Sequence, residues 1–214
     1  MTAFIIKTFA QWPYDDALVF MEEARAQVTK DPSLIIIGIG SHKESVITMG
    51  KNPRLSIIHH HVLSKRKDIL LRTIERGGGA TIHEPGQVVL YPVLNIKFHR
   101  IYPSRLISIL ESALLRTFVR YGVAGTCSSL GPGIFIDGKK VAFIGLRIKN
   151  YITSHGMAVN VLNDGKLFGA IDPCGIAGLA ITSLHRCAPN VELKQFFSCL
   201  SEDFQKELQK HLDA

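Results

Sequence analysis

The chain has 214 residues, of which 46% are hydrophobic and 20% are charged. This balance is ordinary for a globular protein and excludes a disordered chain, and the longest unbroken apolar stretch, Leu34–Ile39, is far too short to cross a bilayer. The net charge of +7 favours solubility or an acidic partner, because a basic run such as Lys65–Lys67 is too short to indicate nucleic-acid binding. The length and composition predict one domain spanning residues 1–214.

The first half of the chain predicts a helix, then strands, then a second helix. Apolar residues recur at helical spacing over Tyr14–Val28. Short β-branched stretches separated by turn residues predict four strands: Leu34–Ile39, Val46–Met49, Leu55–Val62 and Ile69–Ile74. The glycine-rich segment Arg76–Gln87 leads into a further strand, Val88–Ile96. Helical spacing returns at Pro103 and stops at Gly122.

The second half of the chain begins with a hairpin signal. Ile134–Ile136 and Val141–Ile148 flank Asp137-Gly138, a dipeptide that suits the positive φ angles of a tight hairpin turn. A strand over Met157–Leu162 and an amphipathic helix over about 191–212 complete the predicted elements. Hairpin-type strands mixed with a few helices indicate an α+β protein, whose mixed, largely antiparallel sheet is flanked by helices.

Two features of the sequence indicate the cellular compartment: the acidic residues near the N-terminus and the spacing of the cysteines. The N-terminal region fits neither a secretory signal nor an acid-poor transit peptide, since it contains Asp15, Asp16, Glu22 and Glu23. The four cysteines lack zinc-ligand spacing and are expected to be free thiols in a reducing compartment: Cys127, Cys174, Cys187 and Cys199. A cytoplasmic location is therefore expected.

A glycine turn and one cysteine carry the functional signal. Gly77–Gly79 removes every Cβ over three residues, so the backbone can reach positive φ and approach a ligand closely. Cys174 lies between a proline and a glycine, which indicates a presented thiol rather than a packed one. A thiol with a pKa of about 8.5 needs an activator at neutral pH. His155 or a lysine could serve, and the residues alone do not separate Lys139, Lys140, Lys149 and Lys166.

Other motifs do not meet their own requirements. Gly38-Ile-Gly40 lacks the third glycine of a dinucleotide fingerprint, and the chain contains no P-loop pattern. Gln87 occupies the position where a zinc-protease motif beginning at His83 needs its second histidine. The run His59–His61 places two imidazoles on one face of a predicted strand, but with no carboxylate or further histidine expected nearby. A solvated strand face is predicted there rather than a metal site.

Four blocks, in matching order and spacing within about residues 17–184, resemble the lipoyl(octanoyl) transferase family. They are Arg76–Gln87, Pro132–Ile148, His155–Asn160 and Pro173–Ile176. The resemblance implies the catalytic core shared with biotin- and lipoate-protein ligases. It also implies transfer of octanoyl from acyl carrier protein to a lysine of lipoyl domains, found in 2-oxoacid dehydrogenases and the glycine cleavage H protein. No cofactor or metal is implied, because the octanoyl donor is a thioester on the phosphopantetheine of acyl carrier protein.

The resemblance also assigns roles to residues of this chain. It implies that Cys174 bears the acyl group and that Lys140 tunes its thiol. The implied substrate-binding residues are Arg76, Gly77, Gly78, Gly79, Ala80, Thr81, Ile82, His83, Phe143, Ile144, Gly145, Gly156, Met157 and Ala158. Among them, the apolar side chains of Ile82, Phe143, Ile144 and Met157 suit the lining of a narrow slot for an eight-carbon chain. Glu84 departs from the family pattern, which has glycine there, and puts the rim of this slot in question.

Two other functions compete with octanoyl transfer. An ATP-dependent lipoate- or biotin-protein ligase would use the same fold, but the chain lacks the Arg/Gly-rich adenylate loop of biotin ligases, and a ligase has no need of Cys174. A non-catalytic module that binds lipoyl domains or acyl carrier protein would not need both Cys174 and Lys140. The retention of this pair favours the transferase.

Overall fold

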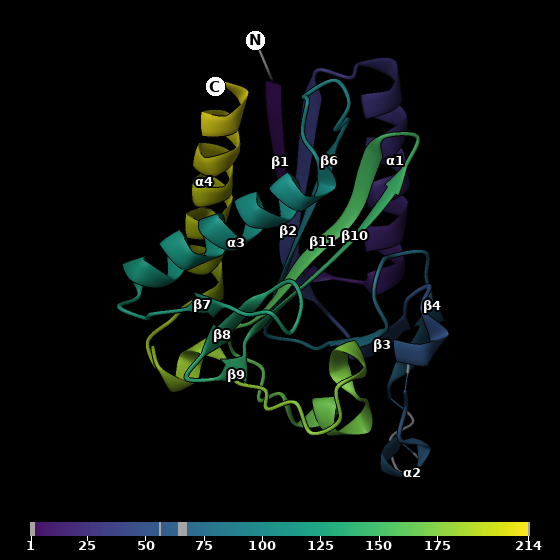
Figure 1. Ribbon diagram of the computed structural model, residues 1–214, viewed down its shortest axis with the longest axis vertical. Helices are drawn as coiled ribbons and strands as arrows, with labels where there is room; N and C mark the ends of the chain where they lie inside the picture. Colours follow the sequence, from purple (N-terminus) through teal and green to yellow (C-terminus); the bar gives the residue numbers. More distant parts are fainter. Residues whose placement is uncertain (1–2, 56, 64–67, 214) are drawn as a thin grey trace.

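The computed structural model describes residues 3–55, 57–63 and 68–213 and is built around a five-stranded sheet (Figure 1). The strands run in the order β1-β2-β6-β11-β10, with bounds Ala3–Trp12, Leu34–His42, Gln87–Leu94, Ile152–Asn160 and Ala142–Lys149. The pair β1–β2 is parallel and the other three pairs are antiparallel. The predicted mixed, largely antiparallel sheet is therefore confirmed.

Helices cover both faces of this sheet. One face packs against α1 (Tyr14–Lys30), and the other packs against α3 (Pro103–Arg120) and α4 (Leu193–Leu212). β6 and β11 are buried along their whole length for this reason. These three helices confirm the helices predicted from periodicity. Among the described residues, no helix combines the length and apolar character that crossing a membrane requires.

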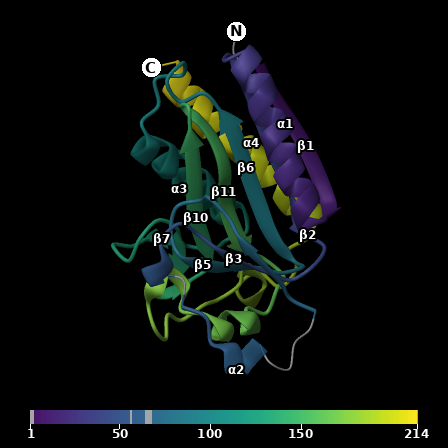
Figure 2. The ribbon, with the colours of Figure 1, turned by 90° about the vertical axis from the view of Figure 1, so that its right-hand side faces the viewer.

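Smaller elements gather at the lower end of the main sheet (Figure 2). Two three-stranded sheets have the orders β4-β3-β5 and β7-β8-β9, with bounds Leu70–Thr73, Val46–Met49 and Ala80–His83, and then Thr126–Cys127, Ile134–Ile136 and Lys139–Lys140. Short helical segments are α2 (His60–Leu63) and the 3-10 turns Pro53–Leu55, Lys166–Ala170, Pro173–Gly175 and Leu184–Arg186. This end of the molecule holds the candidate site.

In the N-terminal third, one strand prediction was wrong and one strand was missed. The predicted strand Leu55–Val62, of which Ser56 lies outside the described residues, is a 3-10 turn followed by a short segment and α2, with a single bridge at Ile58. A β-branched run becomes a strand only where a neighbour supplies a ladder, and the described residues of this segment form one isolated bridge. The sequence also gave no prediction for β1, an edge strand whose half-exposed side chains show little alternation.

The predicted hairpin is present but shorter than expected. The turn at Asp137-Gly138 has positive φ at both residues and joins β8 to β9, which contains only two residues. The chain then leaves this small sheet, and β10 pairs with β11 in the main sheet instead. The last predicted strand is correspondingly longer and starts earlier, at Ile152. The connection from β10 to β11 is a turn at Asn150 and Tyr151, which have positive φ although neither is glycine, so the sequence pattern did not reveal the change of sheet.

Candidate active site

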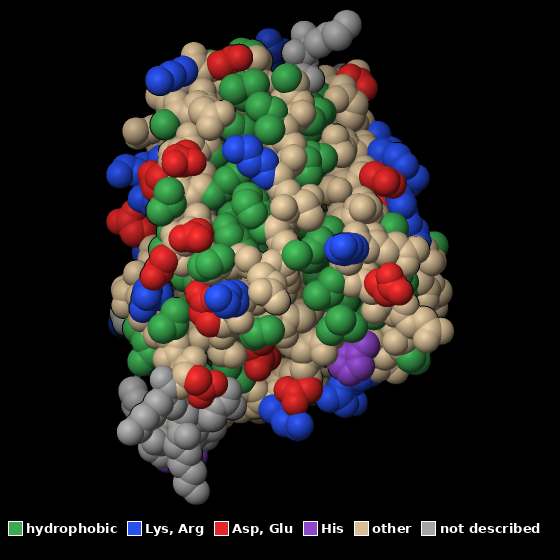
Figure 3. Space-filling model, turned by 180° about the vertical axis from the view of Figure 1, so that it is seen from behind, with side chains coloured by type: hydrophobic (Ala, Val, Ile, Leu, Met, Phe, Trp, Pro, Cys, Tyr) green, Lys and Arg blue, Asp and Glu red, His purple; other side chains and the backbone are tan. Residues whose placement is uncertain are grey.

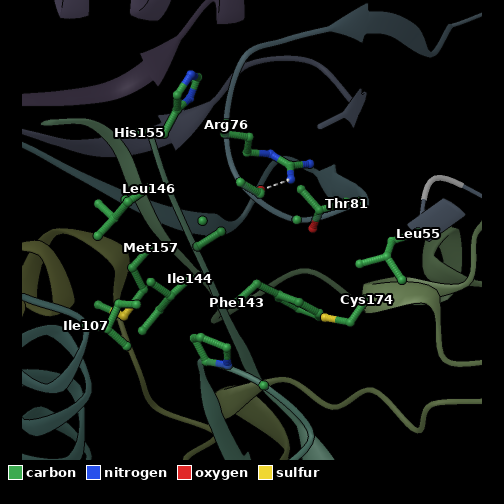
Figure 4. A pocket seen from close by; sticks show the side chains of 18 of the residues that line it. Leu55, Arg76, Thr81, Ile107, Phe143, Ile144, Leu146, His155, Met157 and Cys174 are labelled. Atoms are coloured by element: carbon green, nitrogen blue, oxygen red, sulfur yellow. Dashed lines mark hydrogen bonds between the residues drawn. The ribbon is translucent and has the colours of Figure 1, made fainter. Parts of the chain in front are cut away.

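Cys174 lies in the 3-10 turn Pro173–Gly175 and faces a cavity (Figure 4). Its backbone has φ 60° and ψ 15°, in the left-handed region that residues with a side chain seldom adopt. The side chain is half-buried, and all four cysteines of the chain are free thiols. The turn thus presents one accessible thiol to this cavity.

Lys140 on β9 reaches this thiol from the small sheet. Its side chain is fully buried, and its Nζ donates to Pro132 O at 3.1 Å and to Cys174 Sγ at 3.5 Å. The ammonium also lies over two aromatic rings, 5.4 Å from the Phe135 centroid and 5.3 Å from the Phe143 centroid. Lys139, the adjacent residue on the strand, is exposed on the opposite face. The catalytic roles of Cys174 and Lys140 stay predictions, with a geometry that suits them.

A glycine makes room for the Lys140 side chain. Gly133 has φ 132°, and a Cβ at this position would clash with the backbone oxygen of Ala142 and lie 3.0 Å from Lys140 Cε. Neither the backbone angle nor the space suits a residue with a side chain. Gly133 therefore allows this turn to approach both Ala142 and the Lys140 side chain closely.

The cavity has a volume of about 470 Å³ and is mostly apolar. From Cys174 it passes Phe143 toward Ile107, Ile144 and Met157 (Figure 4). The lining residues that the sequence did not predict are Leu55, Tyr91, Pro103, Ile107, Leu130, Gly131, Pro132, Leu146 and Ile148. They come from loops, strands and α3 and carry no shared local signal, although Pro132, Leu146 and Ile148 lie within one of the four blocks.

Thirteen of the fourteen predicted substrate-binding residues line this cavity, and Ile82 does not. Its side chain is completely buried in an apolar cluster with Ile47 and Phe168. Side chains alternate along a strand, so Ile82 points away from the face that presents Thr81 and His83. The prediction that Ile82 lines an acyl slot is therefore wrong.

Arg76 places an unbalanced positive charge beside the cavity. The side chain is 6% exposed; Nη2 donates to Thr48 O at 2.9 Å and to Thr48 Oγ1 at 2.7 Å, and Nη1 donates to Gly77 O at 3.0 Å. Nε has no partner among the described residues, and the cavity lining contains no Asp or Glu. Burial lowers the pKa of Arg76, but a guanidinium keeps its proton in proteins.

The histidines beside Arg76 are neutral. Burial, followed by the charges of Arg76 and Arg147, lowers the pKa of His155 to about 3. Burial also holds the pKa of His83 well below its ordinary value. Gln87 Nε2 donates to Ile82 O and Asn160 Oδ1, so Gln87 Oε1 accepts the hydrogen bond from His83 Nδ1 at 2.8 Å.

The two kinds of candidate activator, a histidine and a lysine, lie at different distances from Cys174. His155 lies at a different end of the cavity from Cys174 (Figure 4). Lys140 is the lysine in contact with the thiol. Of the candidates that the residues alone left open, Lys140 is the one whose geometry suits activation of the thiol, and its role stays a prediction.

Two further motifs of the sequence find a structural explanation. Glu84 accepts a hydrogen bond from Asn163 Nδ2 at 3.2 Å and does not line the cavity, so the carboxylate does not narrow its rim. The expectation of no carboxylate near His59–His61 was wrong, because His59 Nε2 lies 2.9 Å from Asp172 Oδ1. In the described part of the chain, no three His, Cys, Asp or Glu side chains are grouped as metal ligands.

Comparison with known proteins defines the family. Residues 13–205 match the lipoyl protein ligase A/B catalytic domain, and the chain belongs to this family. It is 31% identical to an octanoyltransferase of Thermosynechococcus vestitus over 199 residues, covering 91% of this chain and 87% of that one. The fold resembles a lipoate-protein ligase A bound with ATP, with a TM-score of 0.71 at 13% identity over 96% of this chain and 86% of that one. A biotin protein ligase from Aquifex aeolicus gives a TM-score of 0.57 at 10% identity over 98% and 72%.

Proposed function

We propose that this protein is an octanoyltransferase that moves an octanoyl group from acyl carrier protein through a Cys174 thioester to a lysine of lipoyl domains. The observation that carries this proposal is the 3.5 Å contact between Lys140 Nζ and Cys174 Sγ at the wall of an apolar cavity. The octanoyltransferase relative supports the choice of acyl group. A cytoplasmic location and a single catalytic domain belong to the same proposal.

The first step exchanges one thioester for another. The Cys174 thiolate, stabilised by the Lys140 ammonium, attacks the donor carbonyl, and a new C–S bond replaces the bond to the carrier. The departing carrier thiolate takes a proton from Lys140. The overall change in free energy of this step is small, because one thioester bond is broken and another is formed.

The second step forms an amide. Neutral Lys140 accepts the proton of the incoming lysine amine, which attacks the acyl carbon as the C–S bond to Cys174 breaks. Amide formation from a thioester is downhill, so the proposal requires no nucleotide. For the oxyanion, the Gly77 N–H is already donated to Leu146 O at 3.0 Å, which leaves the N–H groups of Gly78 and Gly79 as candidates in this loop.

The proposed protein partners are acidic, and one part of the cavity rim is basic. The charges of Arg147, Lys51 and Lys149 lower the pKa of Glu75. Arg147 also pairs with Glu22 at 3.1 Å, so this group holds three cations and two carboxylates and keeps a surplus of one positive charge. Lys51 N donates to Arg76 O at 3.1 Å, so this basic rim adjoins the glycine turn. By contrast, acidic and basic side chains are interspersed over the face seen in Figure 3. Of the residues expected to contribute, Arg54 is exposed near Lys51, and Lys65–Lys67 lies outside the described residues.

Intact mass spectrometry tests the proposal. Incubation with octanoyl-acyl carrier protein, without ATP, is expected to add one octanoyl group that hydroxylamine removes, and an apo lipoyl domain is expected to receive it. Cys174→Ser should abolish the adduct, whereas Cys187→Ser, a change at an exposed cysteine, should not. An adduct on another cysteine would refute the assignment, and a strict need for ATP would favour a ligase.

A further inference from the structure

Cys174, the proposed nucleophile, has a left-handed backbone conformation that is unusual for a residue other than glycine. A non-glycine residue at φ 60° persists only where its surroundings hold it there. Within the turn, Gly175 N donates to Asp172 O at 2.9 Å and Ile176 N donates to Pro173 O at 3.1 Å. These local bonds close the turn but do not attach it to the rest of the molecule.

A strap formed by residue 55 and residues 57–59 makes that attachment. His59 N donates to Ala170 O at 2.8 Å, and Asp172 N donates to Ile57 O at 3.2 Å. Ile58 forms an antiparallel bridge with Ile171. The strap therefore runs alongside the segment that leads directly into the Cys174 turn.

One side-chain bond joins the strap to the turn itself. His59 Nε2 lies 2.9 Å from Asp172 Oδ1, with the two side chains 35% and 13% exposed. Both residues and Pro173 line a second cavity of about 360 Å³, whose lining does not include Cys174. His59 thus contacts the residue before the turn from outside the cavity that the thiol faces.

We propose that His59 is a positioning residue for Cys174, acting through Asp172 to hold the turn where the thiol meets Lys140. Lys140 is held by bonds that do not involve His59 or Asp172, since Lys140 N donates to Ala180 O at 2.8 Å and Thr182 N donates to Lys140 O at 3.0 Å. The two reacting side chains therefore have separate supports, and loosening one separates the pair. The catalytic importance of His59 rests on the proposed function, whereas its effect on the position of Cys174 can be tested without it.

Alkylation of Cys174 by iodoacetamide, followed by peptide mass mapping, tests this positioning without any acyl donor. His59→Phe keeps a ring but removes the bond, and we expect alkylation at neutral pH to slow by about tenfold, within the roughly hundredfold that a 1 Å displacement can cost. His59→Gln retains an N–H for Asp172 and should restore most of the rate. His211→Gln, near the end of α4, is the matched control and should react like the wild type. Thermal unfolding of each variant establishes that it is folded.

A double-mutant cycle separates positioning from general loosening. In a Lys140→Ala background the contact is already absent, so His59→Phe should have no further effect on alkylation. Equal slowing by His59→Phe in both backgrounds, or a wild-type rate for the single variant, would overturn the inference. If His59→Phe does not fold, Asp172→Ala takes its place with the same expectations. A His59 effect without octanoyl loading of wild-type Cys174 would refute the proposed function alone.

Discussion

The two polar ends of the cavity differ in the partners that surround their positive charge. At one end, Lys140 and Cys174 are 34 positions apart in the chain and meet at 3.5 Å, so a cation faces the sulfur whose charge it can stabilise. At the other end, Arg76 is buried with hydrogen bonds to neutral acceptors, beside neutral His83 and His155. A charged pair can carry out proton transfer and nucleophilic attack. A buried cation with no carboxylate in the described cavity lining instead keeps a positive potential along the cavity wall.

The Lys140 end should be the more sensitive to substitution. Lys140→Ala removes both the stabilising charge and the proton carrier, and general acid–base groups typically contribute about 100-fold or more. We expect a loss of that order in the single-turnover rate of Cys174 octanoylation. Lys139→Ala is the matched control, because Lys139 is exposed on the opposite face of β9. Equal losses in the two variants would contradict the proposed pair.

Behind the Arg76 end, buried histidines should make the fold sensitive to acid. Burial lowers the pKa of His42 from 6.5 to about 4. Between these values the unfolded chain binds the proton and the folded chain does not, so stability is complete above pH 6.5 and falls as the pH drops toward 4. From pH 7 to pH 5 this histidine alone should cost about 2 kcal/mol of unfolding free energy.

Urea denaturation at the two pH values measures this effect. His42→Gln should make the difference between pH 7 and pH 5 smaller by about 2 kcal/mol, although His83 and His155 titrate in the same direction and leave a residual slope. His211→Gln, far from this cluster, should leave the difference unchanged. An unchanged difference in His42→Gln would show that His42 is not held neutral by burial.

The smallest expected effect concerns the rim outside the Arg76 end. Reversing Lys51 and Lys149 together to Glu should lower kcat/KM for octanoyl-acyl carrier protein by about three- to tenfold, because rim charges act mainly on encounter. The loss should shrink as salt is raised, and acylation by a small octanoyl thioester should be unaffected. Reversing Lys194 and Lys206, exposed residues of α4, changes the net charge equally and should have little effect. Equal losses in both double variants would mean that overall charge, not this rim, attracts the donor.

Periodicity was a reliable guide where one face of an element meets a large core. The three long helices were predictable because their apolar stripes pack on the main sheet. Two short strands, Val46–Met49 and Ile134–Ile136, were also predicted with the bounds of β3 and β8. The strap was not, since Ile58 joins Ile171 at an isolated bridge rather than along a ladder. Ile82 was misplaced for a related reason: a motif gives the order of residues, and the direction of each side chain depends on which face of β5 the rest of the chain covers.

The sequence by itself determined the chemical groups: a presented thiol, a glycine turn, a basic surplus, and motif blocks that pointed to octanoyl transfer. The motif blocks also implied the pairing of Lys140 with Cys174, and the tertiary structure decided how these and the other groups meet. It brought Lys140 rather than His155 to Cys174, buried Arg76 in a cavity wall without a carboxylate, and placed His59 against Asp172. The physical reason is that composition and local pattern fix what a residue can do. Its partner, its burial and hence its protonation depend on contacts between segments that lie far apart in the chain.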